Sequence, residues 1–459
     1  MEEYKVPQPK KVKSTKRESE LLRLFLENNE TINNIWLNTS DPYMPWEKFR
    51  VRHQQGQFKL VEKGQPISAD EAWFLLAFRR QFASQTSPII DKSGKKFTWS
   101  KLPTHEKQLH EFDMKIGGNM MSERMAAGKV KKERFLRQSL VEEAIASSQL
   151  EGAATTRDRA KKMLVENKQP KNHDEWMIYN NYQTIRKISQ EVSNYDLSRE
   201  VLLDLHVLMT RNAIEADQMG RWRKDDDEIV VKRQIGAEEY IVHVPPSEGV
   251  LQQELDKLID FANDKDGSKN EFIHPIVKAI ILHFWFAYLH PFCDGNGRLA
   301  RSLFYWYLIK HDYWLIEYLP ISMVIKKSPA QYADSYIYSE QYQSDLNYFI
   351  DYNFRKLQQA LAMFDRHVEE IREKSHLIDR FVPEKGLNER QKQVLHHLLG
   401  KPEDELTITQ HANFHEVGWL TASRDIKDLM MRGYLSNEKR GKEVYYTASD
   451  KLVKMLGDG

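Results

Sequence analysis

One stretch, HPFCDGNGRLAR at residues 290–301, combines side chains and turn residues that could carry out chemistry together. His290 ends an apolar run, and imidazole is the side chain that most readily accepts a proton near neutral pH. Asp294 offers a hard carboxylate oxygen, which Mg²⁺ typically takes together with phosphate oxygens. A proton acceptor beside a metal-binding carboxylate indicates chemistry on a phosphate compound.

The second half of this stretch is suited to holding an anion. A Gly-Asn-Gly turn at residues 295–297 can adopt positive φ angles at little cost, and it leads directly into a helical pattern. Backbone N–H groups at such a helix start point outward and attract anions. Arg298 and Arg301 lie on one helical face, so both can reach the same anion. Because arginine in a first helical turn opposes the helix dipole, a bound negative partner is favoured.

Simpler interpretations exist for each part taken alone. A histidine at the end of a buried helix is usually structural, and Asn-Gly is a common hairpin turn. Here both flanks have helical periodicity, so the combination favours phosphate binding. A zinc site formed by His283 and His290 is disfavoured, because seven residues of helix separate them by about 10 Å.

The segment that must position these groups is the most apolar part of the chain, Phe272 to Phe292. Its apolar residues recur at helical spacing over 274–290, and Pro291 ends the helix. Lys278 lies inside the segment, which is marginal in length and wrong in composition for a membrane span. We expect a helix buried in a protein core.

Helical patterning dominates the remaining sequence, so the predicted fold class is mainly α. Two hairpin signals interrupt it, one over Glu228–Pro246 and one around residues 91–94. Further helices are expected over residues 133–165, 171–192, 198–212, 298–310 and 345–375.

Changes in pattern divide the chain into four predicted parts. Residues 1–45 are expected to form a flexible basic tail, and residues 46–130 a mostly helical region. A helical core covers residues 131–380, and a separate module covers residues 387–459, after a boundary near residues 381–386.

Composition restricts the class of protein. A net charge of +1 over 459 residues gives no argument for nucleic acid or a membrane surface as a partner. Cys293 is the single cysteine, so a disulfide within the chain is impossible and a reducing, cytoplasmic setting is expected. The first residues are basic and polar, without the apolar core of a signal peptide.

The stretch at 290–301 resembles the signature of the Fic (Fido) family, HPFx[DE]GNGRxxR, at every specified position. Four other segments follow the order found in Fic cores: LHVLM at 205–209, GRWR at 220–223, the hairpin region and VPP at 244–246. The resemblance covers roughly residues 130–370. It implies an all-helical core with a β-hairpin flap over the active site.

The resemblance also implies an activity. Most Fic proteins transfer AMP from ATP to a Ser, Thr or Tyr hydroxyl of a target protein. By this resemblance His290 is the base that deprotonates the hydroxyl, and Asp294 holds Mg²⁺ between the α- and β-phosphates. Arg298 and Arg301 contact the β- and γ-phosphates. The backbone N–H groups that cradle the phosphates would be those around Gly295, Asn296 and Gly297.

Two further sites come from the same resemblance. The flap would clamp a target segment by main-chain strand pairing. Tyr332, in SPAQYADSY, resembles a tyrosine that lines the adenine pocket, with core packing as the open alternative. The flap residues expected to pair with the target are Ile229, Val230, Val231 and Lys232.

A second motif, EAIASSQLEGA at residues 143–153, matches the family's inhibitory signature [ST]xxxE[GN] as Ser147 and Glu151-Gly152. The resemblance implies that Glu151 pairs with Arg301 and obstructs the γ-phosphate. Taken alone the pattern is common, and a glutamate on a solvated helix face is the alternative. The motif places the chain among self-inhibited members with an N-terminal inhibitory helix.

The last module reads as three helices and a short β wing, and TASRDIKDLMMRGYL resembles the third helix of winged helix-turn-helix domains. DNA binding would place Ser423, Arg424 and Lys427 in a major groove. Residues 387–459 carry equal numbers of basic and acidic side chains, which disfavours DNA. Protein docking and dimerisation are the alternatives.

Three functions remain open on the sequence. The first is a Mg²⁺-dependent adenylyltransferase that takes ATP, is held inactive by Glu151, and modifies a target protein or itself. The second removes AMP, with Glu151 activating water. The third is a DNA-binding regulator that senses nucleotide. A homodimer is compatible with each, and no membrane partner is expected.

Overall fold

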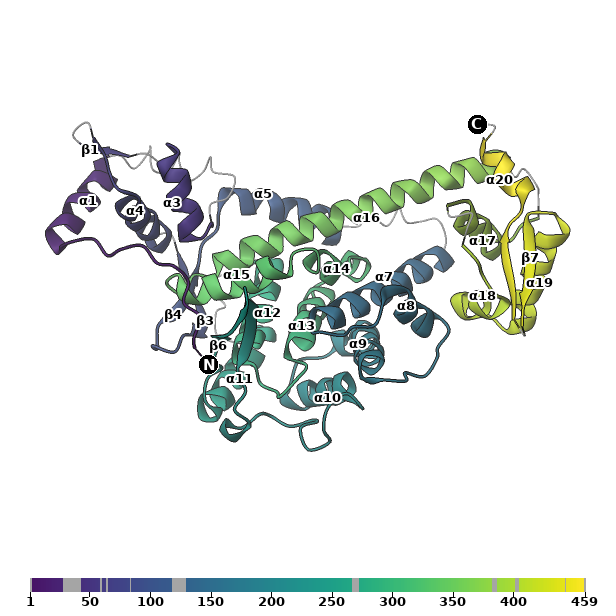
Figure 1. The fold of residues 1–459 in the computed structure, drawn as a ribbon, viewed down its shortest axis with the longest axis horizontal. Coiled ribbons are helices and arrows are strands. Elements are labelled where there is room, and N and C mark those ends of the chain that lie inside the picture. Colours follow the sequence, from purple (N-terminus) through teal and green to yellow (C-terminus); the bar gives the residue numbers. More distant parts are fainter. Residues whose placement is uncertain are drawn as a thin grey trace. The chain divides into compact units, whose positions relative to one another are not determined.

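The computed structural model describes residues 2–27, 43–57, 60–62, 65–82, 84–117, 129–265, 272–381, 386–400, 404–441 and 443–457. The chain is mainly α-helical, as the sequence predicts (Figure 1). Its strands, within these ranges, form antiparallel two-stranded hairpins of neighbours in sequence. Two compact units can be distinguished, and each is described by itself.

The first unit consists of residues 1–118, 187–316 and 325–356. It contains the predicted reactive stretch and both predicted hairpins. Its main elements are α1 (Thr15–Glu27), α3 (Trp46–Gln54), β1 (Val61–Glu62), β2 (Gln65–Pro66), α4 (Ala69–Phe82), β3 (Gln85–Ile90), β4 (Lys96–Trp99), α5 (Pro103–Phe112), α10 (Arg199–Thr210), β5 (Val231–Ile235), β6 (Glu238–His243), α11 (Glu248–Ala262), α12 (Pro275–Leu289), α13 (Asn296–Lys310), α15 (Pro329–Gln341) and the start of α16 (Asn347–Phe381).

Helices α12 and α13 form the centre of this unit and pack against each other. Almost every side chain of α12 is buried, including that of Trp285, and α13 buries Trp306 and Arg298 completely. A helix that is apolar all round must be surrounded by protein, and α11 covers α12 while α10 covers α13. No helix within the described ranges is long and apolar enough to cross a membrane.

The N-terminal region corrects the prediction of a flexible tail over residues 1–45. Helix α1 forms and buries Leu21, Leu24 and Phe25. Upstream, Tyr4 N–H donates to the carbonyl of Ile241 in β6 at 2.8 Å, so this segment pairs in parallel with the hairpin. The basic residues concealed an amphipathic pattern, RESELLRLFLE, whose apolar side chains face α4. Residues 28–42 lie outside the described residues.

The second unit consists of residues 119–186, 317–324 and 357–459. The predicted helix over 133–165 is two helices here, because the chain turns at residues 151–156. The elements are α7 (Lys129–Leu150), α8 (Arg157–Val165), most of α9 (His173–Gln190) and α14 (Ile321–Ile325), the end of α16, α17 (Glu389–Gly400), α18 (Ile408–His415), α19 (Trp419–Met431), β7 (Leu435–Arg440), β8 (Glu443–Ala448) and α20 (Asp450–Gly457).

The C-terminal module has its own apolar core, in which Leu395, Ile426 and Leu429 are fully buried. Ser423 is also buried, with 4% of its surface exposed, so its predicted place in a DNA groove is wrong. Arg424 and Lys427 are exposed on α19. Helices α17, α18 and α19 are followed by the hairpin β7–β8, and membership of the winged-helix class stays a prediction. Most of the predicted boundary at 381–386 lies outside the described residues.

Two leucines of α1 offer a matched test of the N-terminal packing. Leu21→Ala should lower the free energy of unfolding by about 2–5 kcal/mol, because the side chain is fully buried. Leu26→Ala, at a position that is 74% exposed, should change it by less than about 0.5 kcal/mol. Denaturant unfolding of the full chain measures both, and equal effects would contradict the packing of α1.

Candidate functional site

The site is built on the loop between α12 and α13, residues 290–295, which we call the α12–α13 loop. It begins at His290, whose backbone has φ 47° and ψ 59°, in the left-handed region. For a residue other than glycine this conformation costs roughly 1–2 kcal/mol. Pro291 prevents α12 from continuing, so the chain must bend here. The bend places the histidine, rather than a further helical turn, at the end of the apolar helix.

The imidazole of His290 is arranged as a proton acceptor. Its Nδ1 lies 3.3 Å from the carbonyl oxygen of Ala287, which can only accept, so Nδ1 carries the proton and Nε2 keeps its lone pair. Burial, and then the neighbouring His243 and Arg223, lower the pKa of His290 to about 4, despite the opposing effect of Asp294. At neutral pH the ring is therefore uncharged and able to take a proton.

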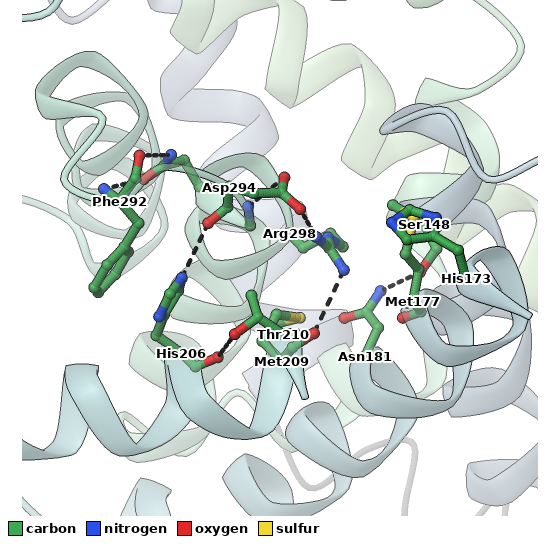
Figure 2. Close-up of polar contacts among 12 residues, drawn as sticks. Ser148, His173, Met177, Asn181, His206, Met209, Thr210, Phe292, Asp294 and Arg298 are labelled. Carbon is green, nitrogen blue, oxygen red and sulfur yellow. Dashed lines mark hydrogen bonds and ion pairs between the residues drawn. The ribbon is translucent and has the colours of Figure 1, made fainter. Parts of the chain in front are cut away.

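The second bend of the loop lies at Gly295, which caps α13 with φ 82°. A Cβ atom at this position would lie 3.2 Å from Cγ2 of Thr210, which leaves little room for a side chain. The side chain of Asn296 closes the loop on itself. Its Oδ1 accepts from the N–H of Phe292 at 2.9 Å, and its Nδ2 donates to the Phe292 carbonyl at 2.7 Å (Figure 2). Asn296 thus fixes the turn through its side chain.

Asp294 and Arg298 form an ion pair across this turn. The carboxylate accepts from the N–H of Gly295 at 2.6 Å and from Arg298 at 2.9 Å (Figure 2). The guanidinium of Arg298 has no exposed surface and also lies 3.5 Å from the carbonyl of Met209. Arg298 therefore holds the loop and α10 in this structure. The side chain of Asp294 is 41% exposed and remains accessible.

The start of α13 has the properties expected of an anion site. No side chain caps its first turn, which begins at Asn296 and Gly297. Helix starts leave backbone N–H groups without partners inside the helix, and the dipole favours negative charge there. Arg301, in the second turn, is buried, with 3% of its surface exposed. Phosphate binding at this helix start stays a prediction that the backbone geometry supports.

Tyr332 lies on α15 and belongs to an aromatic cluster against α12. Its hydroxyl lies 2.8 Å from Nε2 of His283 and 3.1 Å from the hydroxyl of Tyr336. Burial, and then the charge of Arg301, lowers the pKa of His283 well below its usual value, so this ring is neutral. The core packing that the sequence left as an alternative is present. The adenine contact of Tyr332 stays a prediction.

The hairpin β5–β6, which we call the flap, is fixed to α15 by two ion pairs. Arg233 in β5 donates to Asp334 at 2.5 Å. His243 in β6 contacts Glu340 through Nδ1 at 2.8 Å and the carbonyl of Tyr288 through Nε2 at 2.7 Å. Both ring nitrogens of His243 are therefore engaged, one with a carboxylate and one with a backbone carbonyl.

The flap lies where the sequence predicted a hairpin. Of the predicted target-pairing residues, Val231 and Lys232 begin β5, at an irregularity in the pairing register. Ile229 and Val230 precede the strand.

The sequence does not identify His206, on α10, as a site residue, although the family-like segment LHVLM at 205–209 contains it. Its Nδ1 accepts from the N–H of Gly220 at 3.1 Å, so its Nε2 donates to the carbonyl of Asp294 at 3.1 Å (Figure 2). The ring stacks on Phe292 with centroids 3.8 Å apart, and Trp222 stacks on Phe292 at 4.9 Å. His206 therefore holds the α12–α13 loop in two ways: it bonds the backbone carbonyl of Asp294, and its ring stacks on Phe292.

The predicted inhibitory motif lies at the end of α7, in the second unit. Ala153 N–H donates to the carbonyl of Ser148 and Gly152 N–H to that of Gln149, and Gly152 has φ 99°. These bonds form a Schellman motif, in which Glu151 is the C-cap residue and Gly152, the next residue, ends the helix. The glycine of the motif is required by this turn.

Contacts inside the second unit hold this turn in place. Arg157 of α8 donates to both carboxylate oxygens of Glu142 on α7, at 2.7 and 2.5 Å. Asn181 of α9 donates to the carbonyl of Ala144 and the hydroxyl of Ser148. Ser147 is buried, whereas Glu151 is exposed. Both belong to a different unit from Arg301, so the predicted pairing of Glu151 with Arg301 remains a proposal.

Comparison with known proteins identifies part of the chain. Residues 196–308 match the Fic/DOC family, and this stretch is a Fic/DOC domain. A protein adenylyltransferase Fic of Nematostella vectensis is 43% identical over 61 residues, which cover 13% of this chain and 14% of that protein. Another, from Drosophila willistoni, is 35% identical over 71 residues, 16% of this chain and 14% of that protein. The chain thus spans only a small part of these relatives.

Solved structures give a weaker likeness. A Fic family protein from Desulfovibrio desulfuricans G20 is 18% identical, with a TM-score of 0.49 over 76% of this chain and 97% of that one.

The buried His206 predicts a pH dependence of stability. Burial lowers its pKa from 6.5 to about 4, so between these values the unfolded chain binds a proton that the folded protein does not. The free energy of unfolding must then fall as the pH falls through this range. His206→Gln keeps a donor for Asp294 but does not titrate, and should reduce the slope by up to about 1.4 kcal/mol per pH unit. Denaturant unfolding at several pH values measures the slope; an unchanged slope would contradict the assignment.

Proposed function

We propose that the protein is an adenylyltransferase, which transfers AMP from ATP to a Ser, Thr or Tyr hydroxyl of a target protein. One observation carries the proposal: within the Fic/DOC domain, a neutral histidine with an available Nε2 lies one short loop away from an uncapped helix start. The first group can take the proton of a hydroxyl. The second can hold the phosphates of a nucleotide.

The proposed step is a displacement at the α-phosphorus of ATP. The target hydroxyl oxygen forms a bond to this phosphorus while the bond to pyrophosphate breaks, and Nε2 of His290 takes the hydroxyl proton. Pyrophosphate leaves with its electron pair. Positioning and charge stabilisation account for most of the catalysis in such transfers. The rigid closure of the loop by Asn296 and His206 supports the positioning part.

Asp294 is the residue proposed to hold Mg²⁺. Among the residues that the structure describes, no three His, Cys, Asp or Glu side chains gather in a way that could hold a metal. Magnesium at nucleotides needs only one or two carboxylates, because phosphates and water complete its shell. The exposed carboxylate of Asp294, oriented by Gly295 and Arg298, fits that requirement. The ion would neutralise charge on the phosphates.

We further propose that Glu151 restrains the activity by pairing with Arg301. The support is the sequence motif and the Schellman turn, in which Glu151 occupies the C-cap position. An arginine paired with a carboxylate cannot also bind a γ-phosphate bidentately. Removal of AMP from a modified target is the alternative activity of the same site. Release of labelled AMP from a target that already carries it, rather than transfer of label from ATP to the target, would distinguish the two.

His290→Ala should lower AMP transfer by about 10²–10⁴-fold while nucleotide binding persists, because the base is lost and the loop backbone remains. Incorporation from α-labelled ATP measures transfer, and calorimetry with ATP measures binding. His110→Ala, on the exposed side of α5, is the matched control and should transfer normally. Unchanged transfer in the His290 variant would remove this residue from the mechanism.

Glu151→Gly should raise AMP transfer, including self-modification, by about tenfold or more, since it frees the guanidinium of Arg301. The gain should vanish when Arg301→Ala is added, because coupled residues do not contribute additively. The same labelling assay measures all three variants. If Glu151→Gly is no more active than the wild type while His290 is intact, self-inhibition by Glu151 is wrong.

A further inference from the structure

Arg223 makes an unusual set of contacts beside the α12–α13 loop. Only 4% of its surface is exposed. Its Nε donates to the carbonyl of His290 at 2.7 Å, and one terminal nitrogen donates to the carbonyls of Leu289 at 3.2 Å and Pro246 at 2.5 Å. Its own backbone N–H donates to the carbonyl of Pro291 at 2.9 Å. Three successive carbonyls at the bend are thus held by one residue.

These contacts differ from those of an ordinary buried arginine. Buried cations are generally paired with carboxylates, because an unpaired charge is costly to desolvate. The hydrogen bonds that the structure describes for the Arg223 guanidinium all go to backbone carbonyls. Burial lowers the pKa of Arg223, but arginine remains charged in proteins. So costly an arrangement points to a role for the charge at this position.

The contacts satisfy a need that the bend creates. The last carbonyls of a helix have no partners inside the helix, and the negative end of the helix dipole favours a cation there. The left-handed backbone of His290 turns these carbonyls away from a regular helical path. Arg223 supplies donors for the carbonyls on both sides of the bend. It can therefore stabilise a conformation that the sequence of the loop alone disfavours.

The same charge acts on the imidazole of His290. The titratable and charged groups that face this ring are His243 from β6, Arg223 from the segment before the flap, and Asp294 from the loop. Burial has the largest effect and disfavours a protonated ring. His243 and Arg223 act in the same direction as burial, and the carboxylate acts against it. Arg223 thus contributes both to the orientation of the ring and to its neutral state.

We propose that Arg223 is a positioning residue for the transfer reaction: it holds the left-handed bend at His290 and so aims Nε2 at the acceptor hydroxyl, without touching the substrate. This inference rests on the proposed function. It goes beyond that function because it proposes that Arg223 raises the rate of transfer by fixing the orientation of His290.

Two substitutions separate the geometry from the charge. Arg223→Lys keeps the charge but lacks the planar fork that reaches several carbonyls at once. In the Glu151→Gly background it should lower kcat by about tenfold or more and change KM for ATP by less than about twofold. Arg199→Lys is the matched control, since the guanidinium of Arg199 donates to Asp256 and to the side chain and carbonyl of Gln252, away from the loop. A kcat for Arg223→Lys equal to that of the control would overturn the proposal.

Arg223→Gln removes the charge, and its readout does not require activity. The pKa of His290, followed by NMR of the histidine rings with His290→Gln for assignment, should rise from about 4 towards 6.5. The acid limb of the rate profile should move in the same direction. A pKa that stays at its wild-type value would contradict the charge effect. If the Glu151→Gly protein with an intact Arg223 transfers no AMP, the proposed function fails, while this titration still tests the contact.

A measurement on the wild type covers the case in which the variants do not fold. The Nε–H proton of Arg223 should exchange slowly with solvent, because it is buried and bonded to the carbonyl of His290. An exchange rate like that of an exposed arginine would overturn the proposal.

Discussion

The left-handed bend at His290 is the constraint on which the rest of the site depends. Between two buried helices the chain has to reverse within residues 290–295, and it does so through two residues with positive φ. Gly295 adopts its conformation freely, whereas His290 does so at a cost. Because the histidine cannot be replaced by glycine without losing the imidazole, the surrounding structure has to supply the compensating interactions.

Those interactions come mostly from outside the loop and pair many of its backbone groups. Asn296 bonds both polar groups of Phe292, His206 takes the carbonyl of Asp294, and Arg223 takes the carbonyls around His290. Buried backbone groups are costly to leave unpaired, so each of these side chains both stabilises the fold and determines the shape of the site. Stability and preorganisation are therefore not separable at this loop.

The protonation states of the histidines follow from what each ring faces. The rings of His206 and His283 are buried, and burial keeps them neutral. The ring of His243 lies between a carboxylate and a carbonyl. Burial, and then the neighbouring His243 and Arg223, keep His290 neutral as well. A neutral imidazole at the site is what a general base at neutral pH requires.

The sequence by itself determined the local elements of the site. Helical periodicity with Pro291 fixed the end of α12, the glycines at 295 and 297 indicated the turn, and hairpin residues located the flap. These features depend on neighbours within a few positions. Prediction from the sequence failed for the N-terminal tail, because polar residues concealed the amphipathic pattern of α1. It also failed for Ser423, because the burial of this side chain depends on which face of α19 packs against the core of the C-terminal module.

Only the tertiary structure decided which distant side chains complete the loop. His206 and Arg223 lie 88 and 67 positions from the carbonyls they bind, and neither residue type nor spacing identifies such a partner. Tyr332 likewise has its hydroxyl against His283 because α15 packs on α12, not because of any local pattern. Short stretches of sequence determine local hydrogen bonds and periodicity, whereas contacts across the core form only when the helices pack.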